Sequence, residues 1–254
     1  MDTLYLRATI AYDGTDFLGF QWQMTGRTVQ GVLETALAQV TQATPRVAAA
    51  GRTDTGVHAQ GQVIGFHVPW QHPLADLQRA LNAVLPADVA VLTLGPAEPG
   101  WHPRFSAVRR TYRYTVLNRP IRSPLDRRYA HLVAAPLDPA RLQAAAALLV
   151  GEHDFASFGQ PTQGENTMPE TTGRTVRVIF SAAWRRADDR FTFDVIGNAF
   201  LRGMVRRMVG CTLQVGLGCW SVERLAALLA ARERSLSAPP APACGLCLMQ
   251  VDYE

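Results

Sequence analysis

Residues 51–59 place a carboxylate in a setting that suits chemistry. Asp54 stands between two glycines, at positions 51 and 56, and Arg52 lies two residues before it. Loops between strands commonly carry catalytic groups, and a nearby guanidinium can steer or pair with a carboxylate. A tight turn in which Asp54 bonds its own backbone explains the same spacing. The segment therefore indicates either a catalytic loop or a structural turn.

The triplet Asp-Thr-Gly at 54–56 also occurs in aspartic peptidases. Those enzymes need two such carboxylates that share a proton. This chain has one Asp-Thr-Gly, and Gly-Arg-Thr precedes it rather than apolar residues. The sequence therefore disfavours a peptidase.

Arginine and aromatic residues interleave between residues 104 and 128. This stretch has eight arginines and one acidic residue, Asp126. Aromatic rings can stack on bases while guanidinium groups hold phosphates, so the stretch suits RNA. An amphipathic strand with solvated or paired arginines fits the same pattern. Alternation over 105–117 predicts a strand with two faces, one carrying Arg110, Tyr112, Tyr114 and Val116 and the other Arg109, Thr111 and Arg113.

A second basic segment lies on the helix predicted over residues 199–216. Arg202 and Arg206 are four residues apart and share a face of that helix. No acidic residue occurs from 198 through 222, a pattern that favours an anionic partner.

The four cysteines give no credible metal site. Cys244 and Cys247 have the CxxC spacing, but a zinc site needs further ligands, and Cys211 and Cys219 have the wrong spacing to supply them. We therefore expect Cys244 and Cys247 to act as small, buried hydrophobic side chains that bind no metal. The chain also lacks a disulfide framework, a signal-peptide pattern and an apolar run of about 18 residues, so we expect a cytoplasmic protein with no membrane association.

Charge is distributed unevenly along the 254 residues, whose net charge is +4. Residues 1–104 contain six arginines and eight acidic residues, whereas residues 105–254 contain 19 arginines and 13 acidic residues. We therefore divide the chain into an N-terminal half, 1–104, that carries the Asp54 loop and a basic C-terminal half, 105–254. The absence of lysine excludes a Schiff-base or Walker-A lysine.

Both halves mix strand and helix patterns without strict alternation of the two. This favours an α+β fold with a largely antiparallel sheet. Residues 158–173 are rich in Gly, Pro, Thr and Gln, and we expect a surface loop there. Strands are predicted near 4–10, 61–68, 89–94, 105–117, 175–184, 190–197 and 246–251, and helices over 29–40, 74–85, 138–151, 199–216 and 221–232.

Five blocks of this sequence, in order and across nearly the whole chain, resemble the tRNA pseudouridine synthase A family. The first block has Phe20 where a Trp is common in the family. The blocks are residues 12–21, 51–63, 110–114, 198–210 and 241–248.

The resemblance implies an isomerase that converts uridine to pseudouridine at positions 38, 39 and 40 of the tRNA anticodon stem-loop. It implies a mixed, mostly antiparallel central sheet flanked by helices, with a basic RNA-binding cleft. Members of the family are homodimers and use no cofactor, so we expect both properties here. The competing class is a non-catalytic RNA-binding or RNA-folding module, in which Asp54 is structural.

The resemblance also assigns roles to individual residues. It implies that Asp54 is the catalytic carboxylate and that Arg206 pairs with it. Tyr112 corresponds to the tyrosine that contacts the target base. Arg52 corresponds to an arginine that assists base flipping, and Leu246 would help form the base pocket.

Overall fold

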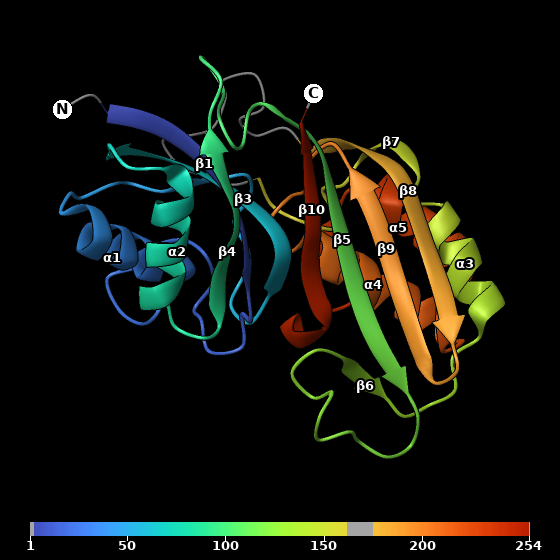
Figure 1. Ribbon diagram of the computed structural model, residues 1–254. Helices are drawn as coiled ribbons and strands as arrows, with labels where there is room; N and C mark the ends of the chain where they lie inside the picture. The colour runs from blue at the N-terminus through green and yellow to red at the C-terminus, as the bar shows by residue number, and fades with distance from the viewer. Residues whose placement is uncertain (1–2, 162–174, 254) are drawn as a thin grey trace. The chain divides into compact units, whose positions relative to one another are not determined.

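The chain divides into two compact units in the computed structural model, which describes residues 3–161 and 175–253 (Figure 1). Unit 1 comprises Met1–Val108 and Cys247–Glu254, and unit 2 comprises Arg109–Leu246. The loop predicted at 158–173 lies mostly outside the described residues. The functional division at residue 104 stays a prediction.

The sheet of unit 1 has β1 at its centre, between β4 and β3, and both of those pairings are antiparallel. The short strand β2 also pairs antiparallel with β3, whereas β10 pairs with β3 in parallel. A Cβ on Gly61 would lie 2.3 Å from the Met249 carbonyl oxygen, so glycine allows β3 and β10 to approach this closely. The strands are β1 (Thr3–Tyr12), β2 (Ala48–Ala49), β3 (His58–Pro69), β4 (Val89–Pro96) and β10 (Leu246–Tyr253).

Two helices complete unit 1, α1 (Val29–Thr41) and α2 (Leu74–Val84), and they contact each other. α1 begins after Thr28, whose side chain accepts a hydrogen bond from the Gly31 N–H, the usual arrangement of an N-cap. The core follows from the period of two along β1, because alternate residues are buried: Leu6, Ala8, Ile10 and Tyr12.

The sheet of unit 2 follows the order β5–β9–β8–β7 with antiparallel pairing throughout. β6 pairs in parallel with the end of β5. The alternation predicted along β5 is confirmed, since Arg110, Tyr112, Tyr114 and Val116 are buried and Arg109 and Arg113 are exposed. The strands are β5 (Ala107–Asn118), β6 (His131–Val133), β7 (Gly151–Asp154), β8 (Val176–Ala187) and β9 (Arg190–Gly197).

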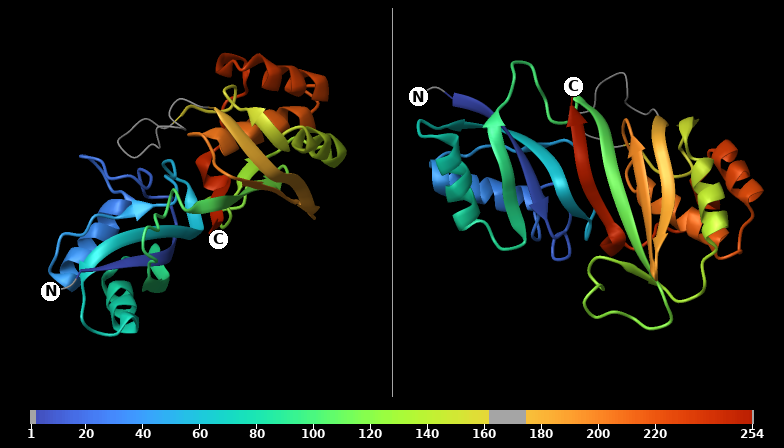
Figure 2. Two further views of the ribbon diagram at one scale, coloured as in Figure 1. Left: turned by 90° about the horizontal axis from the view of Figure 1, so that it is seen from above. Right: turned by 45° about the vertical axis from the view of Figure 1, so that its right-hand side comes forward.

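Three helices pack together on one side of the unit 2 sheet (Figure 2). They are α3 (Pro139–Ala147), α4 (Met204–Gly216) and α5 (Val222–Ala231). α4 begins at Met204, so the start predicted at residue 199 is wrong. Gly203 precedes the helix with φ +71°, a left-handed conformation that stops the helix from extending backward.

The α+β class with a mixed, mostly antiparallel sheet is therefore confirmed, and helices flank the strands in both units. The sequence missed β2, β6 and β7, which have two to four residues and too little length to show a period. The basic RNA-binding cleft stays a prediction.

Candidate active site

The loop that carries Asp54 lies in unit 1, between β2 and β3. Residues 12–21, called here the N-terminal block, hold it in place. The Phe20 N–H donates to the Thr53 carbonyl at 3.0 Å, and the Gly56 N–H donates to the Phe17 carbonyl at 3.3 Å. Asp54 itself is half-buried, and its carbonyl accepts the Val57 N–H at 3.1 Å. The loop is thus fixed on both sides of the carboxylate.

Thr53, directly before Asp54, is also held through its side chain. Its Oγ1 lies 2.8 Å from the hydroxyl of Tyr12, and both side chains are buried. Gly19 has φ +95°, and a Cβ there would lie 2.8 Å from the Thr53 carbonyl oxygen. Glycine at 19 therefore lets the N-terminal block lie against the backbone of the Asp54 loop.

His58 ties the other end of the loop to the same block. Its Nδ1 accepts the Gly14 N–H at 3.0 Å and lies 3.1 Å from Oδ1 of Asp13. A Cβ on Gly14 would lie 2.0 Å from the Val57 carbonyl oxygen, so no other residue fits at this approach. Sequence reasoning assigned no role to these supporting contacts, because the partners are about 40 residues apart and leave no local signal.

Arg52 is exposed within this loop. It has no ion-pair partner among the described residues, so pairing of Arg52 with Asp54 is not observed. The preceding residue, Gly51, is anchored through its carbonyl, which accepts a hydrogen bond from Gln62 Nε2 at 2.7 Å. The backbone on the N-terminal side of Arg52 is thereby tied to β3.

Tyr112 lies in unit 2 on the buried face of β5. It is 9% exposed, and its ring meets Phe200 edge to face with centroids 5.1 Å apart. The neighbouring Arg110 donates from one terminal nitrogen to the Asn198 carbonyl at 2.6 Å. The segment before α4 therefore packs against the face of β5 that carries Tyr112.

Arg206 lies in the first turns of α4, where residues 241–246 orient its side chain. Its Nε donates to the Ala241 carbonyl at 2.7 Å, and the Ala241 N–H donates to the Arg206 carbonyl at 2.9 Å. The first bond orients the Arg206 side chain, and the second ties the backbone of α4 to residue 241. Leu246, at the end of the same segment, is 5% exposed.

Tyr114 anchors that segment from β5. Its hydroxyl donates to the Pro242 carbonyl at 2.8 Å, and its ring lies against Gly245, where a Cβ would be 2.6 Å from Cζ. Burial raises the pKa of Tyr114 well above its ordinary value, so the hydroxyl remains a hydrogen-bond donor. Unit 2 thus anchors residues 241–246, which contact Arg206 and end at Leu246, to the strand that bears Tyr112.

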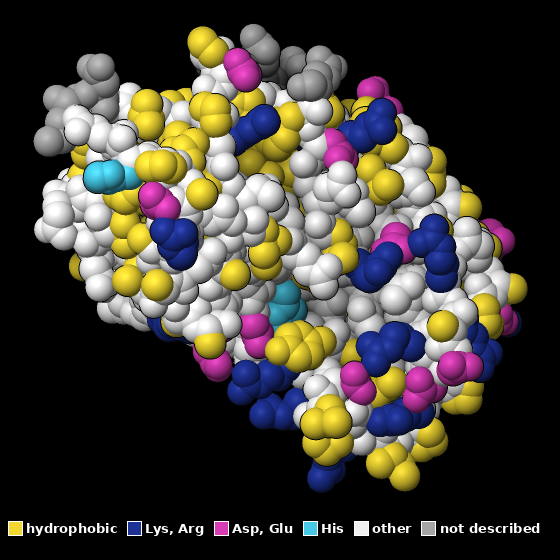
Figure 3. Space-filling model, viewed as in Figure 1, with side chains coloured by type: hydrophobic (Ala, Val, Ile, Leu, Met, Phe, Trp, Pro, Cys, Tyr) yellow, Lys and Arg dark blue, Asp and Glu magenta, His cyan; other side chains and the backbone are white. Residues whose placement is uncertain are grey.

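The opposite face of β5 has a different character. Arg113 makes two hydrogen bonds to the carboxylate of Asp194, with Nε–Oδ1 at 2.7 Å, and Arg185 approaches the same carboxylate at 2.5 Å. The guanidinium of Arg109 lies 5.2 Å above the ring of Phe180. Arginines and acids alternate across β5, β9 and β8 on this face (Figure 3). Arg113 is therefore paired with an acidic residue, as expected if β5 is an amphipathic strand with paired arginines.

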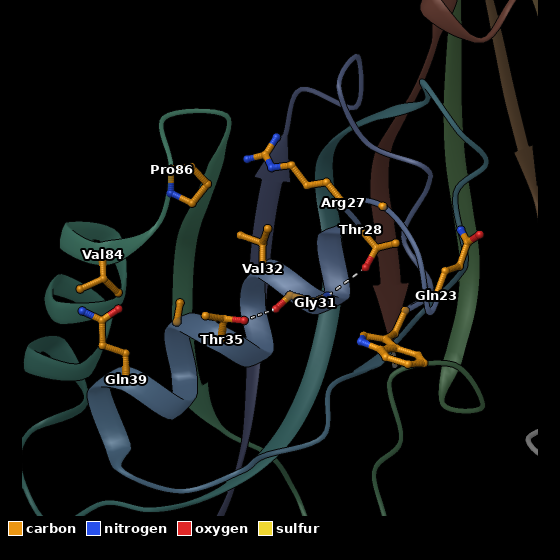
Figure 4. A pocket seen from close by; sticks show the side chains of 12 residues that line it. Gln23, Arg27, Thr28, Gly31, Val32, Thr35, Gln39, Val84 and Pro86 are labelled. Carbon is orange, nitrogen blue, oxygen red and sulfur yellow. Dashed lines mark hydrogen bonds between the residues drawn. The ribbon is translucent and has the colours of Figure 1, made fainter.

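A groove of about 440 Å³ in unit 1 lies beside α1 (Figure 4). None of the predicted site residues lines it, and the hydrogen bonds of Thr28 and Thr35 along its wall are made within the helix. The lining includes Thr28, Gly31, Thr35, Gln39, Val84 and Pro86. The groove contributes nothing to the candidate site.

Cys244 and Cys247 are half-buried, so the expectation that they are buried is wrong. Cys244 Sγ donates to the Ala130 carbonyl at 3.8 Å, and Cys247 Sγ donates to the Leu248 carbonyl at 3.7 Å. Within the described ranges, no three His, Cys, Asp or Glu side chains are arranged to hold a metal ion. None of the helices described there has the length and apolar character to cross a membrane.

Comparison with known proteins decides the family. The sequence profile described as tRNA pseudouridine synthase matches residues 8–106 and 145–254. The chain belongs to the tRNA pseudouridine synthase family. A tRNA pseudouridine synthase A of Roseiflexus sp. (strain RS-1) is 44% identical over 248 residues, which cover 96% of this chain and 88% of that protein. A tRNA pseudouridine synthase A of Syntrophotalea carbinolica is 42% identical and is covered to 96% of its length.

Membership of the tRNA pseudouridine synthase family confirms the predicted class of enzyme. The protein is an isomerase that acts in tRNA pseudouridylation. The matched ranges include Arg52, Asp54, Arg206 and Leu246, whereas Tyr112 lies in the unmatched stretch from 107 to 144. The role of each of these five residues stays a prediction.

Proposed function

We propose that this tRNA pseudouridine synthase modifies uridines 38, 39 and 40 of the anticodon stem-loop and that Asp54 is its catalytic carboxylate. The observation that carries the assignment of Asp54 is the fixed loop around it. Thr53 is held through both its carbonyl and its hydroxyl, while Asp54 is left half-buried. A loop so constrained presents one carboxylate in one geometry, as catalysis requires.

The reaction exchanges one bond of the nucleoside for another. The bond from ribose C1′ to uracil N1 breaks, the base turns in the pocket, and C1′ is joined to C5, whose proton is lost while N1 gains one. A carboxylate can attack C1′, add to the ring or accept the proton from C5. The isomerisation needs no net oxidation and no group donor, in accord with the expectation of no cofactor.

Arg206 is proposed to pair with the Asp54 carboxylate and hold it in position. A hydrogen bond between a guanidinium and a carboxylate is charge-assisted, so it adds both strength and directionality. The bond from Arg206 Nε to the Ala241 carbonyl supports this role, because it orients the side chain in advance.

The target uridine must leave the helical stack before it can react. Unstacking costs a few kcal/mol, and stacking on an aromatic ring returns about 1–3 kcal/mol per base. We assign this stacking to Tyr112, the apolar wall of the base pocket to Leu246, and assistance of flipping to Arg52. We further propose a homodimer with a cytoplasmic location.

One assay tests this function against the RNA-folding alternative. The protein is incubated with tRNA carrying radiolabelled uridine, and the nucleosides released by complete digestion are separated. Wild-type protein is expected to yield pseudouridine at 38, 39 and 40, and tRNAs with cytidine at these positions serve as the negative control. Binding of tRNA without any pseudouridine would establish the RNA-folding alternative instead.

A further inference from the structure

We propose that residues 119–129, called here the arginine loop, bind the sugar–phosphate backbone of the tRNA away from the target uridine. The inference rests on the proposed function for the identity of the RNA and for the place of Leu246 in the base pocket. The loop connects β5 to β6 in unit 2 (Figure 1). It lies within the stretch from 107 to 144 that the family profile does not match.

Positive charge dominates the arginine loop. Its one acidic residue, Asp126, forms an ion pair at 2.9 Å with Arg190, which lies outside the loop on β9. An arginine outside the loop thus pairs with the carboxylate of Asp126. The loop contains four arginines, Arg119, Arg122, Arg127 and Arg128.

Two of these arginines are available to a ligand. Arg122 and Arg127 are exposed, and neither has an ion-pair partner in the described part of the chain. Arg119, by contrast, contacts Asp189 at 3.4 Å and donates from Nε to the Ile121 carbonyl at 2.9 Å. The loop thus has one arginine that shapes its backbone and two that extend into solvent.

The backbone of the loop is ordered by its own hydrogen bonds. The Asp126 N–H donates to Ser123 Oγ at 3.2 Å, and the N–H groups of Tyr129 and Ala130 donate to the Asp126 carbonyl at 2.8 and 2.9 Å. A surface that is ordered before binding loses less conformational entropy when a ligand arrives. The two solvent-facing arginines are therefore presented from a preorganised turn.

The base of the loop adjoins the segment that carries the proposed substrate residues of unit 2. Cys244 donates to the carbonyl of Ala130, and the ring of His131 meets that of Tyr114 with centroids 6.5 Å apart. Tyr114 in turn anchors Pro242, within the residues that orient Arg206 and end at Leu246. Nucleotides that flank a uridine held beside Leu246 would therefore pass near the loop.

The exposed apolar side chains of the loop would also suit a protein partner. The charge of the loop distinguishes an RNA ligand from a protein partner. Ile121 is 76% exposed, Leu125 89% and Tyr129 50%. In a two-fold dimer the same patch commonly meets itself, and two such arginine loops would repel each other. RNA supplies the opposite charge at every phosphate, and the ring of Tyr129 can stack on an unpaired base.

Salt-dependent tRNA binding tests the proposal without requiring activity. In a plot of log affinity against log salt concentration, each phosphate contact steepens the negative slope by about 1. The double variant Arg122→Ala/Arg127→Ala should therefore have a slope that is shallower by about 2. At about 50 mM salt the double variant should bind tRNA roughly tenfold more weakly than wild type. The difference in affinity between the two proteins should narrow as salt rises toward about 200 mM. The readout is filter binding of an unmodified tRNA transcript, so it remains informative even if wild-type protein forms no pseudouridine.

A matched control removes the same charge from another surface. Arg46 and Arg79 are about equally exposed, at 79% and 78%, and pair with Glu34 and Asp76 in unit 1. Arg46→Ala/Arg79→Ala should leave both the affinity and the salt slope at the wild-type values. An equal weakening by both double variants would show a general charge effect and overturn the proposal, as would unchanged binding by Arg122→Ala/Arg127→Ala.

The protein-interface alternative has its own signature. Ile121→Ser/Leu125→Ser retains all four arginines and should leave the sedimentation coefficient of the free protein unchanged. A shift to a smaller species, together with wild-type tRNA binding by Arg122→Ala/Arg127→Ala, would identify the loop as a contact between subunits and overturn the RNA proposal.

Discussion

The hydroxyl of Tyr12 lies 2.8 Å from Oγ1 of Thr53, in a buried hydrogen bond across 41 residues of sequence. It joins the end of β1 to the residue before Asp54. Neither hydroxyl belongs to the carboxylate that we propose to react, so we expect both to act as positioning residues. Their effect on catalysis should appear through the placement of Asp54.

We expect Tyr12→Phe and Thr53→Val each to lower kcat while tRNA affinity is kept. Each change breaks this buried hydrogen bond, whose net contribution is about 0.5–1.5 kcal/mol. Thr53→Ser retains the hydroxyl and is the control that should preserve most activity. Combining Tyr12→Phe with Thr53→Val should cost less than the sum of the single effects, and strict additivity would show that the bond does not couple the two residues.

Gly19→Ala should destabilise the protein and distort the Asp54 loop. A side chain at φ +95° is strained, and its Cβ would lie 2.8 Å from the Thr53 carbonyl oxygen. We expect a loss of about 2–3 kcal/mol and a fall in melting temperature of about 5–10 °C. Gly95→Ala is the matched control, because no atom lies within 4 Å of a Cβ built there. Equal melting temperatures for the two variants would contradict this account.

Asp54→Asn should separate binding from chemistry. The amide preserves the size of the side chain, so the loop should remain folded, but it is a poor nucleophile and base. Removal of a negative charge near bound RNA should not weaken tRNA binding. Melting temperature, tRNA affinity and pseudouridine yield are measured on one preparation. A structural turn predicts the reverse pattern, with lost stability and retained yield.

Tyr112 is expected to contribute its ring more than its hydroxyl. Tyr112→Phe keeps the stacking surface, whereas Tyr112→Ala removes it and forfeits about 1–3 kcal/mol of base stacking. Pseudouridine formation under single-turnover conditions should therefore rank wild type, then Phe, then Ala. Small and equal effects from both substitutions would place Tyr112 outside the site.

Periodicity predicted the long elements and the direction of their side chains. The alternation along β5 correctly assigned Tyr112 to the buried face and Arg113 to the exposed one. The start of α4 was wrong because one glycine conformation, at Gly203, overrides a pattern that continues through it. Local conformation of this kind is not encoded in the spacing of apolar residues.

The supports of the candidate site could not be predicted in the same way. Asp54 was found from its neighbours in sequence, but Tyr12 and Gly19 act on it through contacts between distant segments. Likewise, composition marked residues 104–128 as basic without distinguishing Arg113, which is paired with Asp194, from Arg122, which has no ion-pair partner among the described residues. Pairing depends on cross-strand neighbours, and these become known only with the register of the sheet.

The parallel pairing of β10 with β3 has a consequence for how the chain is synthesised. Unit 2 forms from one continuous stretch, Arg109–Leu246, whereas unit 1 lacks β10 until that whole stretch has left the ribosome. Until then β3 exposes an unpaired edge at His58 and Ala59, next to the Asp54 loop. The loop therefore acquires its final neighbour only after unit 2 has been made, so a nascent chain cannot assemble the candidate site early.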